Sequence, residues 1–299
     1  MIQSTFPKIF AVRTYSKILL IVLLISPFAN SYCQQTIGNN FFSPDNRLQF
    51  ANYLYKDKDY LRAANEFKEY LKTSSNDTIQ FRLSNSLFKI GRFSEASDNF
   101  KGLFFGSKLS EEARLMFFES NFFQSDFNSF RNISDQEVYR SQKYRKEVER
   151  LKFTTYFFDD DALPDENIML NAFPDSAQSQ IDKFYIQKKF PLHKSSTTAA
   201  ILSTLLPGAG KIYTGEIGDG ITALITTALS AYLAYTNFKA DHQFRGWLFT
   251  GLTAFFYGGN IYGSAASAQI YNARIRFDFE KEVKFYFEQR NYFLPQINL

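Results

Sequence analysis

Two long stretches without a charged side chain, 221–238 and 247–271, constrain the fold more than any other feature of this sequence. As α-helices they would be about 27 Å and about 37 Å long, while the hydrocarbon core of a bilayer is about 30 Å thick. Both are rich in Ala, Gly, Ser and Thr, and the short charged segment 239–245 separates them. We therefore expect a two-helix hairpin that crosses a membrane.

The first 33 residues have the three-part layout of a secretory signal. Basic residues precede the apolar run 18–28, and small or polar residues follow it. Three interpretations are open: cleavage after Cys33, lipidation of Cys33, for which the preceding residues match a lipoprotein signal poorly, and an uncleaved anchor. In each of them the segment that follows is exported.

The composition fits an aromatic-rich, helical exported domain. The chain has 35 Phe and 18 Tyr, and its 34 basic residues are nearly balanced by 30 acidic ones. A nucleic-acid-binding surface would instead cluster Lys and Arg on one face, so we expect no nucleic-acid partner. Cys33 is the single cysteine, and its removal with a signal would leave no disulfide or thiol chemistry.

The segment after the signal repeats itself at a spacing of 33 residues. Residues 51–71 align with 84–104, so that Ala63 matches Ala96. This period is typical of helix-turn-helix arrays, in which small residues let paired helices approach and aromatic side chains fill the seam. A third copy is weaker, because Phe130 stands where the small residue is expected.

Over residues 45–104 these positions resemble the tetratricopeptide repeat family, which implies an all-α fold of stacked helix pairs. In that family the first helix of each pair lines a groove that binds extended peptides. The matching positions here are Asn52, Tyr55, Lys56, Asn85, Phe88 and Lys89. Asn amides can bond a peptide backbone and Lys ammonium groups attract carboxylates. The alternative is that these are ordinary residues on an exposed helix face.

These observations divide the chain into five parts. We expect a signal peptide at 1–33, tetratricopeptide-like helical repeats at 40–134, and a helical cap with a linker at 135–194. The membrane hairpin occupies 195–272. The tail, 273–299, has apolar residues four apart, which predicts an amphipathic helix that continues the second span or lies at the membrane interface.

A turn rich in Gly and Pro opens the hairpin. The segment 197–206 is too short to cross a bilayer, and it must end at the following Pro-Gly, because Pro lacks a donor and Gly permits a reversed backbone. The turn resembles that of bacterial membrane-hairpin families with a Pro-Gly-x-Gly-x-x-Tyr-x-Gly string, and the resemblance covers 195–272. The motif residues are Pro207, Gly208, Gly210, Tyr213 and Gly215. These families have no assigned chemistry, so the resemblance implies an architecture; some of these hairpins occur beside or fused to membrane-insertion factors.

Small residues recur every four positions on both expected spans, which lets helix backbones approach each other in lipid. On the second span this stripe is Gly259, Gly263 and Ser267. Two arrangements follow from it. The stripe packs against the first span within one hairpin, or Gly259 and Gly263 mediate a homodimer.

No catalytic or metal-binding pattern accompanies these features. The run 207–211 lacks the leading Gly of a phosphate loop and the Ser or Thr that follows its Lys. The acidic run 159–166 lacks the Gly and the final Glu of a calcium loop. The two histidines, His193 and His242, stand at opposite ends of the first span. We therefore expect neither an enzyme nor a cofactor or metal site.

The signal and the hairpin predict a bacterial inner-membrane protein with its repeats in the periplasm. Basic residues on the outer side run against the usual inward bias of positive charge. We expect a scaffold that binds a protein or extended peptide in envelope assembly or secretion. The alternative is a small membrane subunit of a transport or membrane-protein-insertion machine; neither expected span carries the charge that transport would favour.

Overall fold

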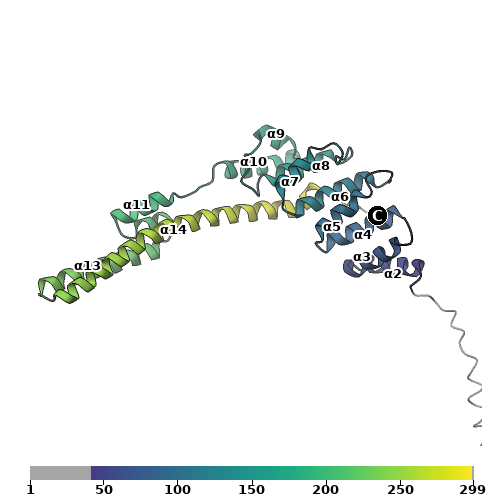
Figure 1. Cartoon of the computed structure of the whole chain (residues 1–299). Helices are drawn as coiled ribbons and strands as arrows, with labels where there is room; N and C mark the ends of the chain where they lie inside the picture. The colour runs from purple at the N-terminus through teal and green to yellow at the C-terminus, as the bar shows by residue number, and fades with distance from the viewer. Residues whose placement is uncertain (1–41, 298–299) are drawn as a thin grey trace, which may run out of the picture. The chain divides into compact units, whose positions relative to one another are not determined.

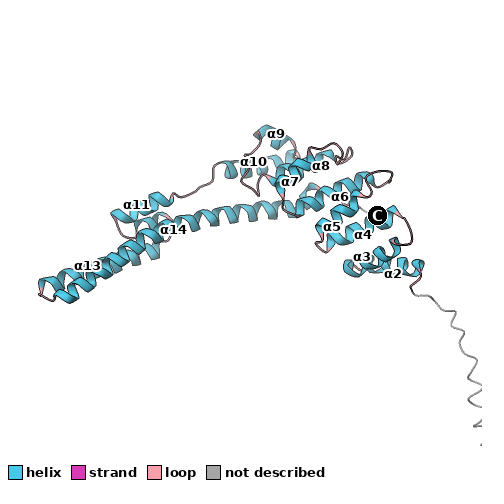
Figure 2. Cartoon of the chain, in the orientation of Figure 1, coloured by secondary structure: helices cyan, strands magenta, loops and turns pink. Residues whose placement is uncertain are grey.

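The computed structural model describes residues 42–297, and every regular element in that range is a helix (Figures 1 and 2). This confirms the prediction of an all-α fold. The expected signal peptide, 1–33, lies outside the described residues. The chain forms two compact units, of which the first ends at Asn76 and the second begins at Asp77.

The first unit contains one helix pair, α2 (Pro44–Lys56) and α3 (Tyr60–Leu71). The Ser43 hydroxyl accepts a hydrogen bond from a backbone N–H of the first turn of α2 and caps it. The Asp59 carboxylate caps α3 in the same way. Ala63 is fully buried between the two helices, as the small-residue position of the repeat requires.

The second unit begins with two further helix pairs. The first of these is α4 (Asp77–Lys89) with α5 (Phe93–Lys101), and the next is α6 (Ser110–Phe123) with α7 (Phe127–Ser134). Helices α4 and α5 begin at the same spacing from α2 and α3 as the sequence repeat. At the irregular position of the third copy, Phe130 is buried with its ring centroid 5.8 Å from that of Phe118.

Three helices follow the pairs: α8 (Arg145–Thr155), α9 (Glu166–Asn171) and α10 (Asp175–Lys189). The guanidinium of Arg131 on α7 is buried and forms ion pairs with Asp159 and Asp161 in the segment after α8. It also donates a hydrogen bond of 2.9 Å to the hydroxyl of Thr155. The acidic run that we considered as a calcium loop therefore neutralises a buried cation of the chain itself.

The remaining helices form the hairpin region and its extension. They are α11 (Ser196–Leu205), α12 (Ala209–Tyr213), α13 (Ile217–Lys239), α14 (Gln243–Gln289) and the short 3-10 helix η1 (Asn291–Phe293). Helix α14 has 47 residues and would be about 70 Å long. It contains both the second expected span and most of the expected tail, so the tail continues the span as one helix.

The carboxyl-terminal half of α14 packs against the helices that precede the hairpin. Phe287 is fully buried, with its ring 6.3 Å from that of Phe157 on the segment after α8 and 5.8 Å from that of Phe173. Phe279 packs edge-on against Phe184 of α10 at 6.1 Å. The tail is thus part of an aromatic core rather than a free surface helix.

Within the described residues, one helix, α13, is both long and apolar enough to cross a membrane. Its most apolar 18-residue window is 22% buried, so most of that window faces outward. The second expected span, 247–271, is uncharged, but it also contains glycines, hydroxyl-bearing side chains and the amides of Asn260 and Gln269, so it is less apolar than α13. The two-span hairpin therefore remains a prediction.

Candidate functional site

The first half of the predicted groove lies on α2. Asn52 and Tyr55 are half-buried there, and Lys56 is exposed. The ring of Tyr55 packs edge-on against Tyr60 at 5.6 Å and against Phe67 at 5.9 Å. Tyr55 therefore helps to hold α2 and α3 together, which leaves Lys56 as the most accessible of the three predicted groove residues on this helix.

The second half of the predicted groove, on α4, repeats this arrangement. Asn85 is half-buried, Phe88 is buried and Lys89 is exposed. The Phe88 ring packs edge-on against Phe93 at 5.4 Å and against Phe123 of α6 at 5.7 Å. The two halves belong to different units of the chain.

Phe88 and Lys89 also line a cavity of about 410 Å³, which we call the Glu119 cavity. Its wall is built from the end of α4, the start of α5, one face of α6, and the end of α14 with η1. Glu119, Glu288 and Tyr292, which come from α6 and from the carboxyl-terminal end, were not predicted from the sequence. No spacing rule connects them, because they are far apart along the chain.

Burial raises the pKa of the Glu119 carboxyl from 4.5 to about 7, and the ammonium of Lys89 opposes that rise. Burial also raises the pKa of Tyr292 to about 12, and the nearby carboxylates of Glu288 and Glu119 add to the effect. At neutral pH the cavity therefore contains a carboxyl group close to its titration midpoint beside a neutral phenol.

The hairpin turn contains two close backbone approaches that only glycine allows. Gly208 has a φ of +90°, and a Cβ there would lie 1.9 Å from the carbonyl oxygen of Gly220. A Cβ on Gly210 would lie 2.0 Å from the carbonyl oxygen of Ala199. The reversed backbone that the sequence predicts at Gly208 is therefore present, and it follows directly after Pro207 ends α11.

A polar seam joins the turn to α14. The Ser203 hydroxyl accepts a hydrogen bond from the backbone N–H of Gly210 at 3.0 Å and bonds the Ser264 hydroxyl at 2.7 Å. The hydroxyls of Thr214 and Ser267 are also 2.7 Å apart. The motif residues thus bring small side chains of α11, α12 and α14 into hydrogen-bonding distance.

Three further residue pairs secure the start of the hairpin region. The Asn272 side chain accepts a hydrogen bond from the backbone N–H of Lys194 at 2.7 Å and donates one to the Lys194 carbonyl at 2.9 Å. The hydroxyl of Tyr213 accepts from the backbone N–H of Ser195 at 3.3 Å. The Lys194 ammonium lies 4.6 Å from the centroid of the Tyr213 ring. Gly215, the last motif residue, has a φ of +93° and ends the turn.

The predicted packing stripe of α14 differs from the observed one at Gly259. Gly259 is exposed, and nothing lies within 4 Å of a Cβ built on it. A Cβ on Gly263 would meet the side chain of Lys211 at 3.5 Å, and Ser267 bonds Thr214 as described. The fully buried residues of this face are Asn260, Ser264 and Ala268, one position further along. The homodimer through Gly259 and Gly263 remains a prediction.

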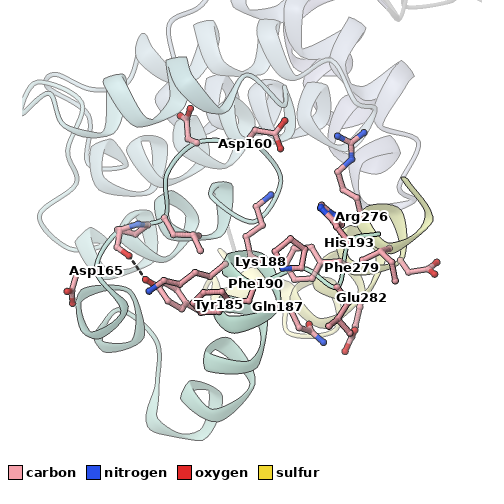
Figure 3. Close-up of a pocket in the computed structure, with 18 residues that line it drawn as sticks. Asp160, Asp165, Tyr185, Gln187, Lys188, Phe190, His193, Arg276, Phe279 and Glu282 are labelled. Carbon is pink, nitrogen blue, oxygen red and sulfur yellow. Dashed lines mark hydrogen bonds between the residues drawn. The ribbon is translucent and has the colours of Figure 1, made fainter. Parts of the chain in front are cut away.

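A larger cavity of about 920 Å³ lies beside the end of α10 (Figure 3). Its labelled side chains include Lys188 and Phe190 from the end of α10 and Arg276 and Phe279 from α14. The Tyr185 hydroxyl donates to the carbonyl of Pro164 at 3.0 Å and closes one side. Both signs of charge occur around it, so its lining favours no one ligand class.

Among residues 42–297 there is no group of three or more His, Cys, Asp or Glu side chains that could hold a metal ion. No family model matches the sequence, and no solved structure matches the chain. The chain is 34% identical over 79 residues to the uncharacterized protein MJ1516 of Methanocaldococcus jannaschii. That alignment covers 25% of this chain and 76% of the relative.

Proposed function

Since the chain belongs, over these 79 residues, to the family of the uncharacterized protein MJ1516, whose name assigns no activity, we propose a function from the residues of the chain itself. It is a membrane-anchored helical scaffold whose repeat helices bind a protein or extended peptide. The setting that fits best is the bacterial inner membrane, with the repeats in the periplasm and a partner in envelope assembly or secretion.

The continuity of α14 is the observation that carries this proposal. One half of the helix packs on α11, α12 and α13, and the other half packs into the aromatic core around Phe287. An anchor and a binding domain that share one uninterrupted helix cannot separate without breaking either core. This is the construction expected of a scaffold that holds a partner near a membrane.

The outward faces of α13 and α14 support the anchor. Large apolar side chains such as Trp247, Phe255 and Tyr262 have exposed fractions of 67%, 73% and 78%. Ile225 and Leu229 on α13 are also more than half exposed. Water opposes this exposure by about 25 cal/mol for each Å² of apolar surface, so these side chains favour a covering surface. A bilayer would cover them.

The exposed Lys56 and Lys89, at equivalent positions of two helix pairs, support a polypeptide partner with carboxylate groups. The test compares Lys56→Glu with Lys58→Glu, whose side chain is also exposed but lies in the turn after α2. Crosslinking of the full chain in native membranes, followed by quantitative mass spectrometry, should show a partner reduced about two- to fivefold by the first variant and unchanged by the second. Equal recovery with both variants would remove Lys56 from the binding surface.

One observation favours the alternative, a small subunit of a transport or membrane-insertion machine. The Lys211 ammonium lies 3.7 Å from the Asp219 carboxylate, and its side chain reaches the surface of α14 at Gly263. A charge pair at the hairpin is costly in an apolar setting unless it has a role. Lys211→Met should abolish transport or insertion under that alternative and leave crosslinking to the scaffold's partner intact.

A further inference from the structure

The Glu119 cavity shares Phe88 and Lys89 with the proposed groove and adds aromatic rings and carboxylates from α5, α6, α14 and η1. Four rings line it, from Phe88, Phe93, Phe123 and Tyr292. The Phe93 and Phe123 rings are stacked with centroids 5.4 Å apart, and Tyr292 meets Phe123 edge-on at 5.4 Å. The rings therefore form a connected wall whose π faces and edges border one space.

Two carboxyl groups share this space. Within the described part of the chain, the Glu119 carboxylate forms no hydrogen bond and no ion pair within 4 Å, and the residue is half-buried. Glu288 forms its ion pair with Lys284, 3.8 Å away on the same helix, where both groups are half-exposed. Partial burial disfavours an unpaired carboxylate, so a cation beside Glu119 would stabilise its charged form.

The backbone at η1 holds one ring in place. Asn291, Tyr292 and Phe293 have φ values of +45°, +52° and +59°, which is a left-handed run of three residues that are not glycine. Each left-handed residue costs roughly 1–2 kcal/mol, so the surrounding contacts must outweigh that cost. The run turns the chain back after α14 and places Tyr292 against Phe122 and Phe123.

The lining selects a cation over other ligands. An anion would meet two carboxyl groups against the single ammonium of Lys89, and an apolar group would leave Glu119 without a partner. Phenyl rings offer a metal ion no ligand atoms. An organic cation gains from both kinds of wall, because it is attracted to ring faces and pairs with carboxylates. The ammonium of Lys89, which lies 5.6 Å from the centroid of the Phe88 ring, already shows this attraction at the rim.

We propose that the Glu119 cavity binds a lysine or arginine side chain of the partner polypeptide, between the aromatic wall and the carboxylates of Glu119 and Glu288. The inference rests on the proposed scaffold function for the identity of the partner as a polypeptide. The groove lysines attract acidic groups of the partner, whereas this cavity attracts a basic side chain. A preferred partner segment therefore carries a basic residue.

The test uses the full chain in detergent micelles and three blocked pentapeptides of the form Gly-Ser-X-Ser-Gly, with Lys, Arg or norleucine at X. Binding is followed by isothermal titration. The Lys and Arg peptides should bind about tenfold more tightly than the norleucine peptide, which corresponds to about 1.4 kcal/mol. Equal binding of the three peptides would overturn the proposal.

Variants of the two carboxylates locate the site. Glu119→Gln keeps the side-chain shape and should weaken binding of the Lys peptide about tenfold, and Glu288→Gln should weaken it by a smaller factor. Glu280→Gln is the matched control, because Glu280 forms the same kind of i,i+4 ion pair on α14, 3.8 Å from Arg276, outside the cavity. Loss of binding in the control as large as that in Glu119→Gln would contradict the assignment.

Lys89→Met tests the cavity at the one ammonium group among its lining residues. Removing the internal ammonium should strengthen binding of the Lys peptide several-fold, because the added cation no longer competes with Lys89. Weaker binding in this variant would overturn the cavity proposal. The scaffold function is tested separately by the crosslinking experiment at Lys56, which lies in the first unit of the chain. A failure of the scaffold function would appear in that experiment, and a failure of the cavity proposal would appear in the peptide titration.

Discussion

The two halves of α14 pack by different means, although they belong to one helix. In the amino-terminal half, small residues and hydroxyls meet the neighbouring helices, as in the 2.7 Å contact between Ser203 and Ser264. In the carboxyl-terminal half, large rings such as Phe279 and Phe287 fill the interface. Close backbone approach with hydroxyl pairing is typical of helices in lipid, whereas burial of large apolar side chains is typical of helices in water.

The outward faces of the two halves differ in the opposite sense. The first half exposes Trp247, Phe255 and Tyr262, while the second exposes i,i+4 ion pairs such as Arg276–Glu280. The outer face of the first half is mainly apolar, whereas the outer face of the second half mixes ion pairs with exposed rings such as Phe285. This difference is the one expected if the surroundings of the helix change along its length. Under the proposed function, the boundary between the membrane anchor and the partner-binding part therefore lies within α14, near Asn272, whose side chain bonds Lys194 at the start of the hairpin region.

The largest expected effect tests the aromatic half. Phe287→Ala removes a fully buried ring from the core and should lower the free energy of unfolding by about 3–5 kcal/mol. Urea unfolding of the full chain in micelles, followed by circular dichroism, measures it. Phe285→Ala is the control, because Phe285 is 61% exposed on the same helix and its loss should cost less than about 0.5 kcal/mol. Similar losses in both variants would mean that the carboxyl-terminal half is not packed as described.

The second prediction concerns pH dependence at the end of the same half. The pKa of Glu119 is raised from 4.5 to about 7, so the folded state binds this proton more tightly than the unfolded state. The stability that results is fully present below pH 4.5 and is lost as pH rises towards 7. Lys89, Glu288 and Tyr292 are the charged or titratable groups that face Glu119 across the cavity.

Glu119→Gln should remove this decline. Relative to the variant, the wild-type protein should lose at most about 3 kcal/mol of unfolding free energy between pH 4.5 and pH 7. Urea titrations at several pH values measure the difference, with Glu280→Gln as the control. A difference that stays constant over this pH range would contradict the burial of Glu119.

The third prediction tests the half with small residues. Gly210→Ala should destabilise the chain by about 1–3 kcal/mol, because the added Cβ meets the carbonyl of Ala199. Gly259→Ala should instead be neutral or stabilising by up to about 1 kcal/mol, since the position is helical and open. Thermal unfolding in micelles compares the two. A destabilising Gly259→Ala would indicate that this face is covered, as the homodimer requires.

The smallest expected effect concerns the polar seam. Ser203→Ala leaves the backbone N–H of Gly210 without its acceptor and should cost about 1–2 kcal/mol. Thr204→Ala is the control, because the Thr204 hydroxyl is exposed and bonds within its own helix. A double-mutant cycle with Ser264→Ala measures the coupling between the two hydroxyls, and a coupling of zero would mean that they do not interact.

Local rules were sufficient for several parts of the structure. The Pro-Gly turn, the reversed backbone of Gly208 and the helix pairs at the repeat spacing all depend on residues that are close in sequence. On α14, Gly263 and Ser267 of the predicted stripe meet neighbouring side chains, whereas the most buried residues lie one position further along. A period of four residues constrains the spacing along a helix, but the angle at which a neighbouring helix approaches determines which stripe is buried.

Such local rules could not predict the Glu119 cavity. Its residues come from α4, α5, α6, α14 and η1, and Glu119 has no distinguishing pattern in an aromatic-rich helix. The pairing of Arg131 with Asp159 and Asp161 was missed for the same reason, since the acidic run reads as solvated when it is considered alone. Each of these depends on contacts between segments that no periodicity connects.

The sequence by itself determined that this chain is helical, where its helices turn and which stretches avoid charge, because these properties depend on neighbouring residues along the chain. Only the tertiary structure decided that the tail of α14 returns to the aromatic core, that Glu119 is enclosed among rings, and that the hairpin turn is joined to α14 through hydroxyls. Those features depend on which distant surfaces meet. A charge or a ring becomes buried, and its free energy changes, only when segments that are distant in sequence pack together.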